Sequence, residues 1–440
     1  MDRIASAANE RTDILHSWCV QAEWNAPTIV GGRGARFFDA DGRVYLDMSS
    51  LAECSNLGHQ HPAVVAAIRA QAEQLCFVTN AWGATPRADL ARALLEKSGF
   101  AGGRVYFTLG GADANEHAVK FARQASGLSE GLIVTRERSY HGASYAAMAW
   151  SGDARTSGRG SAFGSIKVPP PYAYRCPFGS VSAQECGALA ATAVGDALDA
   201  NAGRCAAVLM EPAAGTNGIV APDNYWPAVR QATRARGVYL IADEVMSGFG
   251  RCGEWFAWQR YGAEGRPDLM TLAKGLTGAH LPLGAVVLSA PVAQHLEHEM
   301  LFTGLTYCGH PLACAAGLAA IRAYQDDDLF ARSRRLGTQM FKSLRSMQAR
   351  IPCIGDVRGG HGLFAVVELV RDRNTREPLA PWPQTPSGMK KLVARGLEQG
   401  VSFATRGNLI ILAPPLVIEE NDLADALHLL ERLLTELEIP

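Results

Sequence analysis

Short apolar runs alternate with amphipathic stretches along the middle of the chain, and this alternation constrains the fold more than any other feature. Strands are predicted at 104–109, 131–136, 205–210, 237–243 and 268–273. Helical patterns separate several of these runs, as at 114–126 and 226–236. Because strands that alternate with helices usually pair in parallel, the pattern predicts an α/β protein whose mostly parallel central sheet is flanked by helices.

The two ends of the chain show a different pattern. The stretch RFFDADGRVYLD predicts a hairpin around Asp41–Gly42, and long amphipathic helices at 332–350 and 419–437 bracket further strands in a smaller α+β lobe. At 440 residues the chain exceeds the size at which one core usually stops growing. We therefore expect an N-terminal segment, 1–60, that contributes to the small lobe, a large domain, 61–315, and a C-terminal small domain, 316–440.

Composition excludes several classes of protein. With 42 basic and 43 acidic residues the net charge is −1, which gives no electrostatic footprint for nucleic-acid binding. No uncharged apolar stretch reaches the roughly 18 residues that a membrane span needs, and the first residues lack the apolar region of a secretory signal, so we expect a soluble cytoplasmic protein. The ten cysteines form no CxxC pair, and the HLEH cluster is typical of a polar helix face. We therefore expect no metal site.

Candidate ligand-binding groups follow the predicted strands, where open α/β sheets bind their ligands. After the first strand, Gly110 and Gly111 lead into a helix that Asp113 can cap. Backbone N–H groups at such a helix start bind anions, and glycines let a phosphate approach closely. Taken alone, the motif is equally typical of an ordinary glycine turn.

Two other strands end in charged residues. Asp243 and Glu244 end one strand, and each could serve as a ligand group, a helix cap or a structural ion-pair partner. Lys274 ends another strand, where it either extends its amine to solvent or reacts with an aldehyde to form a Schiff base. Together, a phosphate cradle, a carboxylate and an imine-forming lysine are what pyridoxal phosphate requires.

A series of motifs in order strengthens this interpretation. Seven motifs follow one another from residue 110 to 417, within a resemblance that runs from about residue 20 to 435: GGADANEHAVK, SYHG, MEPAAGTNG, IADEVMSGFGR, LAKGLTG, GLTYCGHPLA and LAPPLV. In this the chain closely resembles the class III pyridoxal-phosphate aminotransferases, the ω-aminotransferase family, and most of all their taurine–pyruvate branch. The resemblance implies a fold-type I subunit and a homodimer, or a tetramer, with active sites at the interface.

The resemblance also implies roles for residues around the cofactor ring. Lys274 would be the Schiff-base lysine, and Asp243 would pair with the pyridine nitrogen. Tyr140 of the SYHG motif would stack on one ring face and Val245 would pack on the other. His141 of the same motif would belong to the cofactor site.

A second group of residues would bind the phosphate. Gly110, Gly111 and Ala112 would form the phosphate turn; a hydroxyl usual in the family is missing here, so backbone N–H groups must suffice. Thr306 of the neighbouring subunit would reach the same phosphate. Glu211 would lie near the cofactor and the substrate entrance.

Three residues are candidates for substrate binding. Arg406 matches the family's carboxylate-binding arginine. Alternatively, Arg406 is a solvated loop arginine, and another arginine of the small lobe, such as Arg358, binds the carboxylate instead. Trp82 would line the substrate pocket. Glu53 stands where many relatives carry a large apolar residue; facing the pocket, it would favour a donor with a second cationic group, and otherwise it must point to solvent or pair with a neighbour.

The expected reaction is transfer of an amino group from an ω-amino acid, a taurine-like compound or another primary amine to a 2-oxo acid, foremost pyruvate, by a ping-pong mechanism. An aminomutase or amino-acid racemase would use the same residues on the same fold. A non-catalytic relative is disfavoured because Lys274 and Asp243 are both present.

Overall fold

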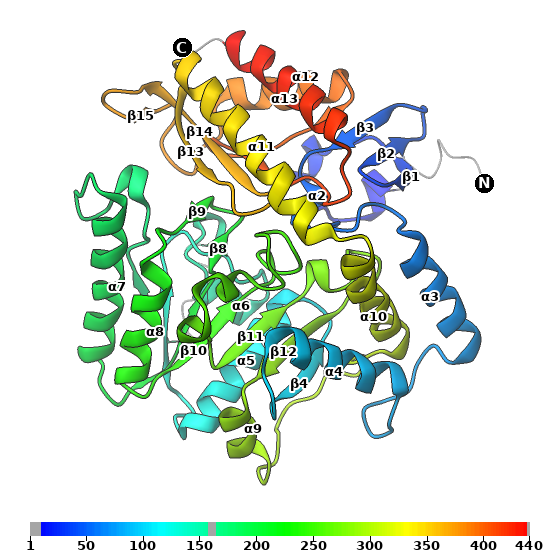
Figure 1. Ribbon diagram of the computed structural model, residues 1–440, viewed down its shortest axis with the longest axis vertical. Coiled ribbons are helices and arrows are strands. Elements are labelled where there is room, and N and C mark those ends of the chain that lie inside the picture. Colours follow the sequence, from blue (N-terminus) through cyan, green and yellow to red (C-terminus); the bar gives the residue numbers. More distant parts are fainter. Residues whose placement is uncertain (1–9, 157–163, 438–440) are drawn as a thin grey trace.

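The computed structural model describes residues 10–156 and 164–437, so the first residues of the predicted N-terminal segment lie outside it. A seven-stranded sheet forms the centre of the molecule (Figure 1). Its strand order is β4 (Arg104–Thr108), β12 (Gly284–Leu288), β11 (Leu269–Leu272), β10 (Tyr239–Asp243), β7 (Cys205–Met210), β5 (Leu132–Arg136) and β6 (Ser165–Val168). The pairs on both sides of β10 and β5 are parallel, and β12 alone runs antiparallel to its neighbours. The mostly parallel sheet expected from the sequence is confirmed.

Alternate residues of each central strand enter two separate cores. Val208 and Leu240 belong to one core, whereas Leu209 and Ile241 belong to the other, and all four are fully buried. Burial on both faces explains why these strands are apolar at every position. Helices α7 (Ala183–Asp199) and α8 (Tyr225–Ala235) contribute to the first core, and α5 (Gly111–Ser126) and α9 (Ala290–Leu296) to the second.

Three more helices extend the large unit. Helix α10 (Pro311–Asp326) packs against both α3 (Pro62–Gln74) and α4 (Thr85–Ser98), beside the sheet edge that holds β4. The boundary predicted between residues 315 and 316 falls inside α10. The three-part domain division stays a prediction. The short helix α6 (Tyr145–Trp150) lies near α5.

The small lobe contains strands from both ends of the chain. The hairpin strands β2 (Arg36–Asp39) and β3 (Val44–Asp47) pair antiparallel as predicted, between β1 (Ile29–Arg33) and β16 (Val401–Ser402). A second sheet contains β13 (Ile354–Gly359), β14 (Ala365–Asp372), β18 (Leu409–Leu412) and β17 (Ala404–Arg406), with β15 (Glu377–Pro378) beside β14. Helices α11 (Leu329–Arg350), α12 (Ser387–Glu398) and α13 (Glu420–Thr435) accompany these sheets at the top of Figure 1. No helix among the described residues is long and apolar enough to cross a membrane.

Candidate active site

The carboxyl ends of parallel strands of the central sheet meet at one cavity of about 230 Å³. Segments that follow β4, β5, β7, β10 and β11 all contribute to its wall. The residues that line it are Gly111, Ala112, Asn115, Tyr140, His141, Gly142, Ala143, Glu211, Gly215, Thr216, Asp243, Val245, Met246, Ala273 and Lys274. The chain therefore places most of the residues predicted around a cofactor ring in one cavity, where open α/β sheets bind ligands.

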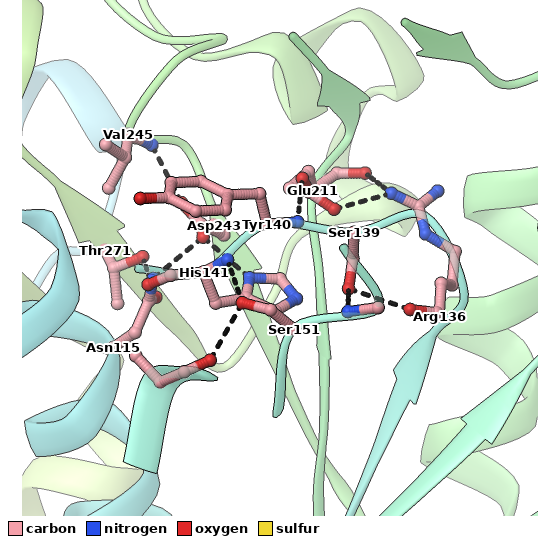
Figure 2. Close-up of polar contacts among 12 residues, drawn as sticks. Asn115, Arg136, Ser139, Tyr140, His141, Ser151, Glu211, Asp243, Val245 and Thr271 are labelled. Atoms are coloured by element: carbon pink, nitrogen blue, oxygen red, sulfur yellow. Dashed lines mark hydrogen bonds and ion pairs between the residues drawn. The ribbon is translucent and has the colours of Figure 1, made fainter. Parts of the chain in front are cut away.

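Asp243, the last residue of β10, is buried, and both of its carboxylate oxygens have hydrogen-bond partners (Figure 2). Its Oδ2 accepts from Asn115 Nδ2 at 2.8 Å and lies 2.8 Å from His141 Nδ1, and its Oδ1 accepts from the Val245 amide at 3.1 Å. Asn115 is held in turn by the Thr271 hydroxyl, which donates to its Oδ1 at 2.7 Å. These donors fix the orientation of the carboxylate and offset the cost of its burial.

Glu211 follows β7 and belongs to a second buried group. Its carboxylate accepts from Arg136 Nη2 at 2.9 Å and from the backbone amide of Tyr140 at 3.1 Å. Because Arg136 and Glu211 are both buried, losing either partner would leave an uncompensated charge. The ion pair therefore fixes the backbone that carries Tyr140 into the cavity wall. Burial raises the pKa of the Tyr140 hydroxyl even though the nearby Arg155 and Lys274 oppose this shift.

Helix α5 begins at the cavity, with Gly110 as its N-cap and Gly111 and Ala112 in its first turn. A Cβ on Gly111 would lie 2.9 Å from a methyl carbon of Val245, so only glycine fits this turn against the segment after β10. Asp113 Oδ2 accepts from the Leu109 amide at 2.7 Å, which ties the end of β4 to the helix. The unpaired N–H groups of the first turn and the helix dipole make this an anion-binding end.

Lys274 follows β11 and forms an ion pair with Glu53, with 2.9 Å between Nζ and Oε2. Burial alone would lower the pKa of the Lys274 amine, but Glu53, together with Cys54 and Asp243, raises this pKa above its ordinary value. Glu53 does not point to solvent: only 8% of its side chain is exposed. Of the alternatives that the sequence left open, the structure shows pairing with a neighbour.

Arg406, at the end of β17, is half-buried, and its Nε has no hydrogen-bond partner among the described residues. Its charged neighbours are Arg155, Asp153 and Glu53; burial, helped by Arg155, lowers the pKa of Arg406. Arg358, the other arginine considered, is fully occupied: its Nη1 lies 2.8 Å from both Asp356 and Glu368.

Five predicted residues do not line this cavity: Gly110, Glu53 and Arg406, described above, and Trp82 and Thr306. Trp82 is 70% exposed, and Thr306 lies on an exposed loop. Arg87 joins their two loops, because its Nη1 donates to the Trp82 carbonyl at 2.9 Å and its Nε to the Gly309 carbonyl at 2.9 Å. Trp82 and Thr306 therefore share one surface of the molecule.

The sequence interpretation missed residues that orient the predicted ones. Asn115, Arg136 and Thr271 hold Asp243 and Glu211 in place, yet none was predicted. Asn115 could have been found from helical phase, since it falls four residues after Gly111 and so on the same face of the helix. Arg136 and Thr271 carry no such signal.

The groups around the cavity fit pyridoxal phosphate. A helix N-terminus suits its phosphate, a buried carboxylate suits its pyridine nitrogen, and a lysine amine suits its aldehyde. His141 Nε2, on the same wall, is buried without a hydrogen-bond partner among the described residues. The donor and acceptor types thus match the cofactor in three separate places.

Comparison with known proteins agrees with this chemistry. The family model for class III aminotransferases matches residues 20–434. The leucine/methionine racemase of Thermococcus litoralis is 36% identical over 94% of this chain and 92% of that protein, and the taurine–pyruvate aminotransferase of Rhodobacter capsulatus is 34% identical over 90% and 88%.

Among solved structures, that of taurine:2-oxoglutarate aminotransferase from Bifidobacterium kashiwanohense, in complex with PLP and glutamate, superimposes with a TM-score of 0.94. It is 36% identical in sequence and covers 99% of this chain and 98% of its own. The chain therefore belongs to the class III pyridoxal-phosphate aminotransferase family, and it is an enzyme.

Proposed function

We propose that the enzyme transfers an amino group from an ω-amino acid, a taurine-like compound or another primary amine to a 2-oxo acid, foremost pyruvate, by a ping-pong mechanism. The observation that carries this proposal is the placement of Lys274 and Asp243 with the start of α5 around one cavity. Similarity to two taurine aminotransferases, one named for pyruvate and one for 2-oxoglutarate, supports the substrate class.

Each residue around the ring has a separate task. Bound pyridoxal phosphate supplies a ring that accepts the electron pair left when a proton leaves the carbon bearing the amine. Lys274 would hold the cofactor through Nζ and, when its amine is free and neutral, would take that proton as a general base. Asp243, oriented by His141 and Asn115, would keep a proton on the ring nitrogen. Tyr140 and Val245 would lie against the ring.

Backbone groups bind the phosphate. The N–H groups of Gly111 and Ala112 serve this role, and Gly110 caps the same helix. Glu211 contributes through Tyr140, whose amide it holds. No side-chain hydroxyl at 110–113 is available for the phosphate, so the dipole of α5 matters more in this chain.

Arg406 binds the carboxylate or sulfonate of the substrate. It is half-buried, its Nε is unsatisfied among the described residues, and Arg358 is held by two carboxylates of its own. A guanidinium that lacks an internal partner is well suited to pair with a carboxylate through two parallel hydrogen bonds.

The active unit is a homodimer in which Trp82 and Thr306 serve the partner's site. Both are exposed, and apolar side chains close to Thr306 in the sequence are exposed as well: Met300, Phe302 and Tyr307. Apolar exposure of this kind marks protein interfaces. Arg87 holds the two loops together and so positions both residues.

A racemase is the second candidate, because one relative of 36% identity is a leucine/methionine racemase. The two activities differ in stoichiometry. An aminotransferase incubated with an amine alone releases one carbonyl product per subunit and retains the amino group, whereas a racemase returns the amino acid with its configuration scrambled.

The test is a panel of donors (taurine, β-alanine, putrescine, γ-aminobutyrate and 1-phenylethylamine) against pyruvate and 2-oxoglutarate. Each donor is first added alone to the purified enzyme, and the carbonyl product is measured. Stoichiometric release with at least one donor supports amino transfer. L-Leucine and L-methionine are added alone in the same way, and loss of their optical purity without any carbonyl product would contradict it.

A further inference from the structure

Glu53 reaches the active site on an unusual piece of backbone. The one-turn helix α2 (Ser50–Glu53) has positive φ at every residue: 49°, 45°, 68° and 57°. It is a left-handed turn closed by hydrogen bonds such as that from the Glu53 amide to the Ser49 carbonyl at 2.8 Å. L-residues other than glycine visit this region as single residues, and none of these four is glycine.

Buried side chains from distant parts of the chain hold this turn. Asp47 Oδ1 accepts from the Ser49 amide at 3.0 Å, and the Ser50 hydroxyl donates to the Ala413 carbonyl at 2.7 Å. Arg251, fully buried, donates to the Ser50 hydroxyl at 2.8 Å. Strained backbone persists only where its surroundings over-determine it, and such strain concentrates at functional sites.

The partner of Glu53 lies in the same kind of backbone. Lys274 also has a positive φ, 43°, and its Nζ is 2.9 Å from Glu53 Oε2. Two residues in strained conformations therefore meet through their charged groups. This contact is the clearest chemical result of the left-handed turn.

Other charged and titratable groups surround the pair. Lys274 is faced by Cys54 just after α2, by Asp243 from β10 and by Tyr140 from the segment after β5. Arg251 and Arg406 face Glu53. Asp243 is already occupied by His141 and Asn115. Glu53 is thus the carboxylate that contacts the amine directly.

We propose that Glu53 is a positioning residue that binds the Lys274 amine in the cofactor-free enzyme, and that it keeps the amine protonated until the cofactor binds. This inference rests on the proposed function, in which Lys274 is the cofactor lysine. It gives Glu53 a role on the enzyme's own lysine, in place of the selection of a dicationic donor. The ion pair with Glu53 slows the return of Lys274 to its neutral, reactive form, but it holds the free lysine in place.

The test uses the full-length chain freed of cofactor. Only a neutral amine attacks an aldehyde, so Lys274 must first release its extra proton to solvent; it then bonds to the aldehyde carbon of added pyridoxal phosphate, and water leaves. The rate of attachment is followed by absorbance between pH 6 and pH 10, and the bond is fixed with borohydride. The attachment rate should rise with pH through an inflection at which Lys274 loses its extra proton. For Glu53→Gln we expect attachment about tenfold faster at a fixed pH below this inflection, which corresponds to a downward shift of the inflection by about one pH unit.

Three comparisons complete the test. Glu73→Gln removes the same charge from an exposed face of α3 and should keep the wild-type profile. Glu53→Asp, which withdraws the carboxylate by one methylene, should give an intermediate inflection, and it decides the matter alone if Glu53→Gln does not fold. An unchanged inflection in the Glu53 variants, with the cofactor fixed on Lys274, would overturn this inference alone; a cofactor fixed elsewhere in the wild type would overturn the proposed function.

Discussion

His141 Nδ1 lies 2.8 Å from Asp243 Oδ2, and both side chains are almost wholly buried. The contact links the segment after β5 to the end of β10 (Figure 2). A carboxylate held in this way by His141 and Asn115 cannot turn away from a ligand. It is therefore organised before the ligand binds, which is the condition under which electrostatic stabilisation is most effective.

Asp243→Asn should separate catalysis from binding. The change keeps the shape of the side chain but removes the charge, and losses of such electrostatic groups typically cost about 10²–10³ in rate. We expect kcat to fall by at least that factor while the purified protein retains most of its cofactor. The measurements are kcat and cofactor content by absorbance. A near-normal kcat would remove Asp243 from the site.

Glu244 should make stability depend on pH. It does not line the cavity, and its carboxylate accepts from the Ala257 and Trp258 amides and the Ser247 hydroxyl. Burial outweighs these bonds and raises its pKa from 4.5 to about 7. Because the folded chain binds this proton more tightly than the unfolded chain, the contribution is fully present below about pH 4.5 and is lost as pH rises to about 7.

The expected loss is about 3 kcal/mol from a shift of this size. In Glu244→Gln this dependence disappears. The measurement is the thermal midpoint of both proteins from pH 5 to pH 8 at one protein concentration. As pH rises, the midpoint of the wild type should fall relative to that of Glu244→Gln. Parallel curves would show that Glu244 is ionised throughout.

Ala52→Gly should reveal the strain in the left-handed turn. Ala52 is exposed at φ 68°, where a left-handed conformation costs about 1–2 kcal/mol for a residue with a Cβ. Glycine removes that cost but loses about 0.5–1 kcal/mol of backbone entropy, so stability should stay equal or rise slightly. Ala66→Gly, in the right-handed helix α3, should instead lose about 0.5–1 kcal/mol. Equal losses in the two variants, measured by chemical denaturation, would contradict a left-handed α2.

The strands and their ends could be predicted because they follow general rules. Buried parallel strands are continuous apolar runs, and this pattern by itself places Asp243 and Lys274 at the carboxyl ends of neighbouring strands. β12 was not predicted: it follows β11 without an intervening α-helix and runs antiparallel. β6 was not predicted either: it is a four-residue edge strand in a stretch, 150–185, that is rich in Gly, Ser and Pro.

The contacts of Glu53 could not be predicted from the sequence. A left-handed backbone conformation is normally indicated in a sequence by glycine or asparagine, and residues 50–53 contain neither. The conformation depends on the Asp47 carboxylate, which accepts from a backbone amide of the turn, and on Arg251 and the Ala413 carbonyl, which are far from the turn in the sequence. Information of this kind arises only when the whole fold is assembled.

Mixed dimers should show which subunit Thr306 serves. A Lys274→Ala subunit carries an intact Thr306, and a Thr306→Ala subunit carries an intact Lys274. If Thr306 acts across the interface, each hybrid has one complete site, and random mixing restores about a quarter of wild-type activity. The measurement is activity after the two inactive or weakened variants are dissociated and reassembled together. No gain over the separate variants would place Thr306 in its own subunit's site or outside any site.

The most direct test of the account is to locate the cofactor on the chain. Purified wild-type enzyme is reduced with borohydride, digested and analysed by mass spectrometry, with Lys274→Ala treated in parallel. We predict that the wild type is yellow, that reduction fixes pyridoxal phosphate to Lys274, and that Lys274→Ala folds but has no turnover. Attachment to a different lysine, or substantial turnover by Lys274→Ala, would contradict the assignment of this cavity as the active site.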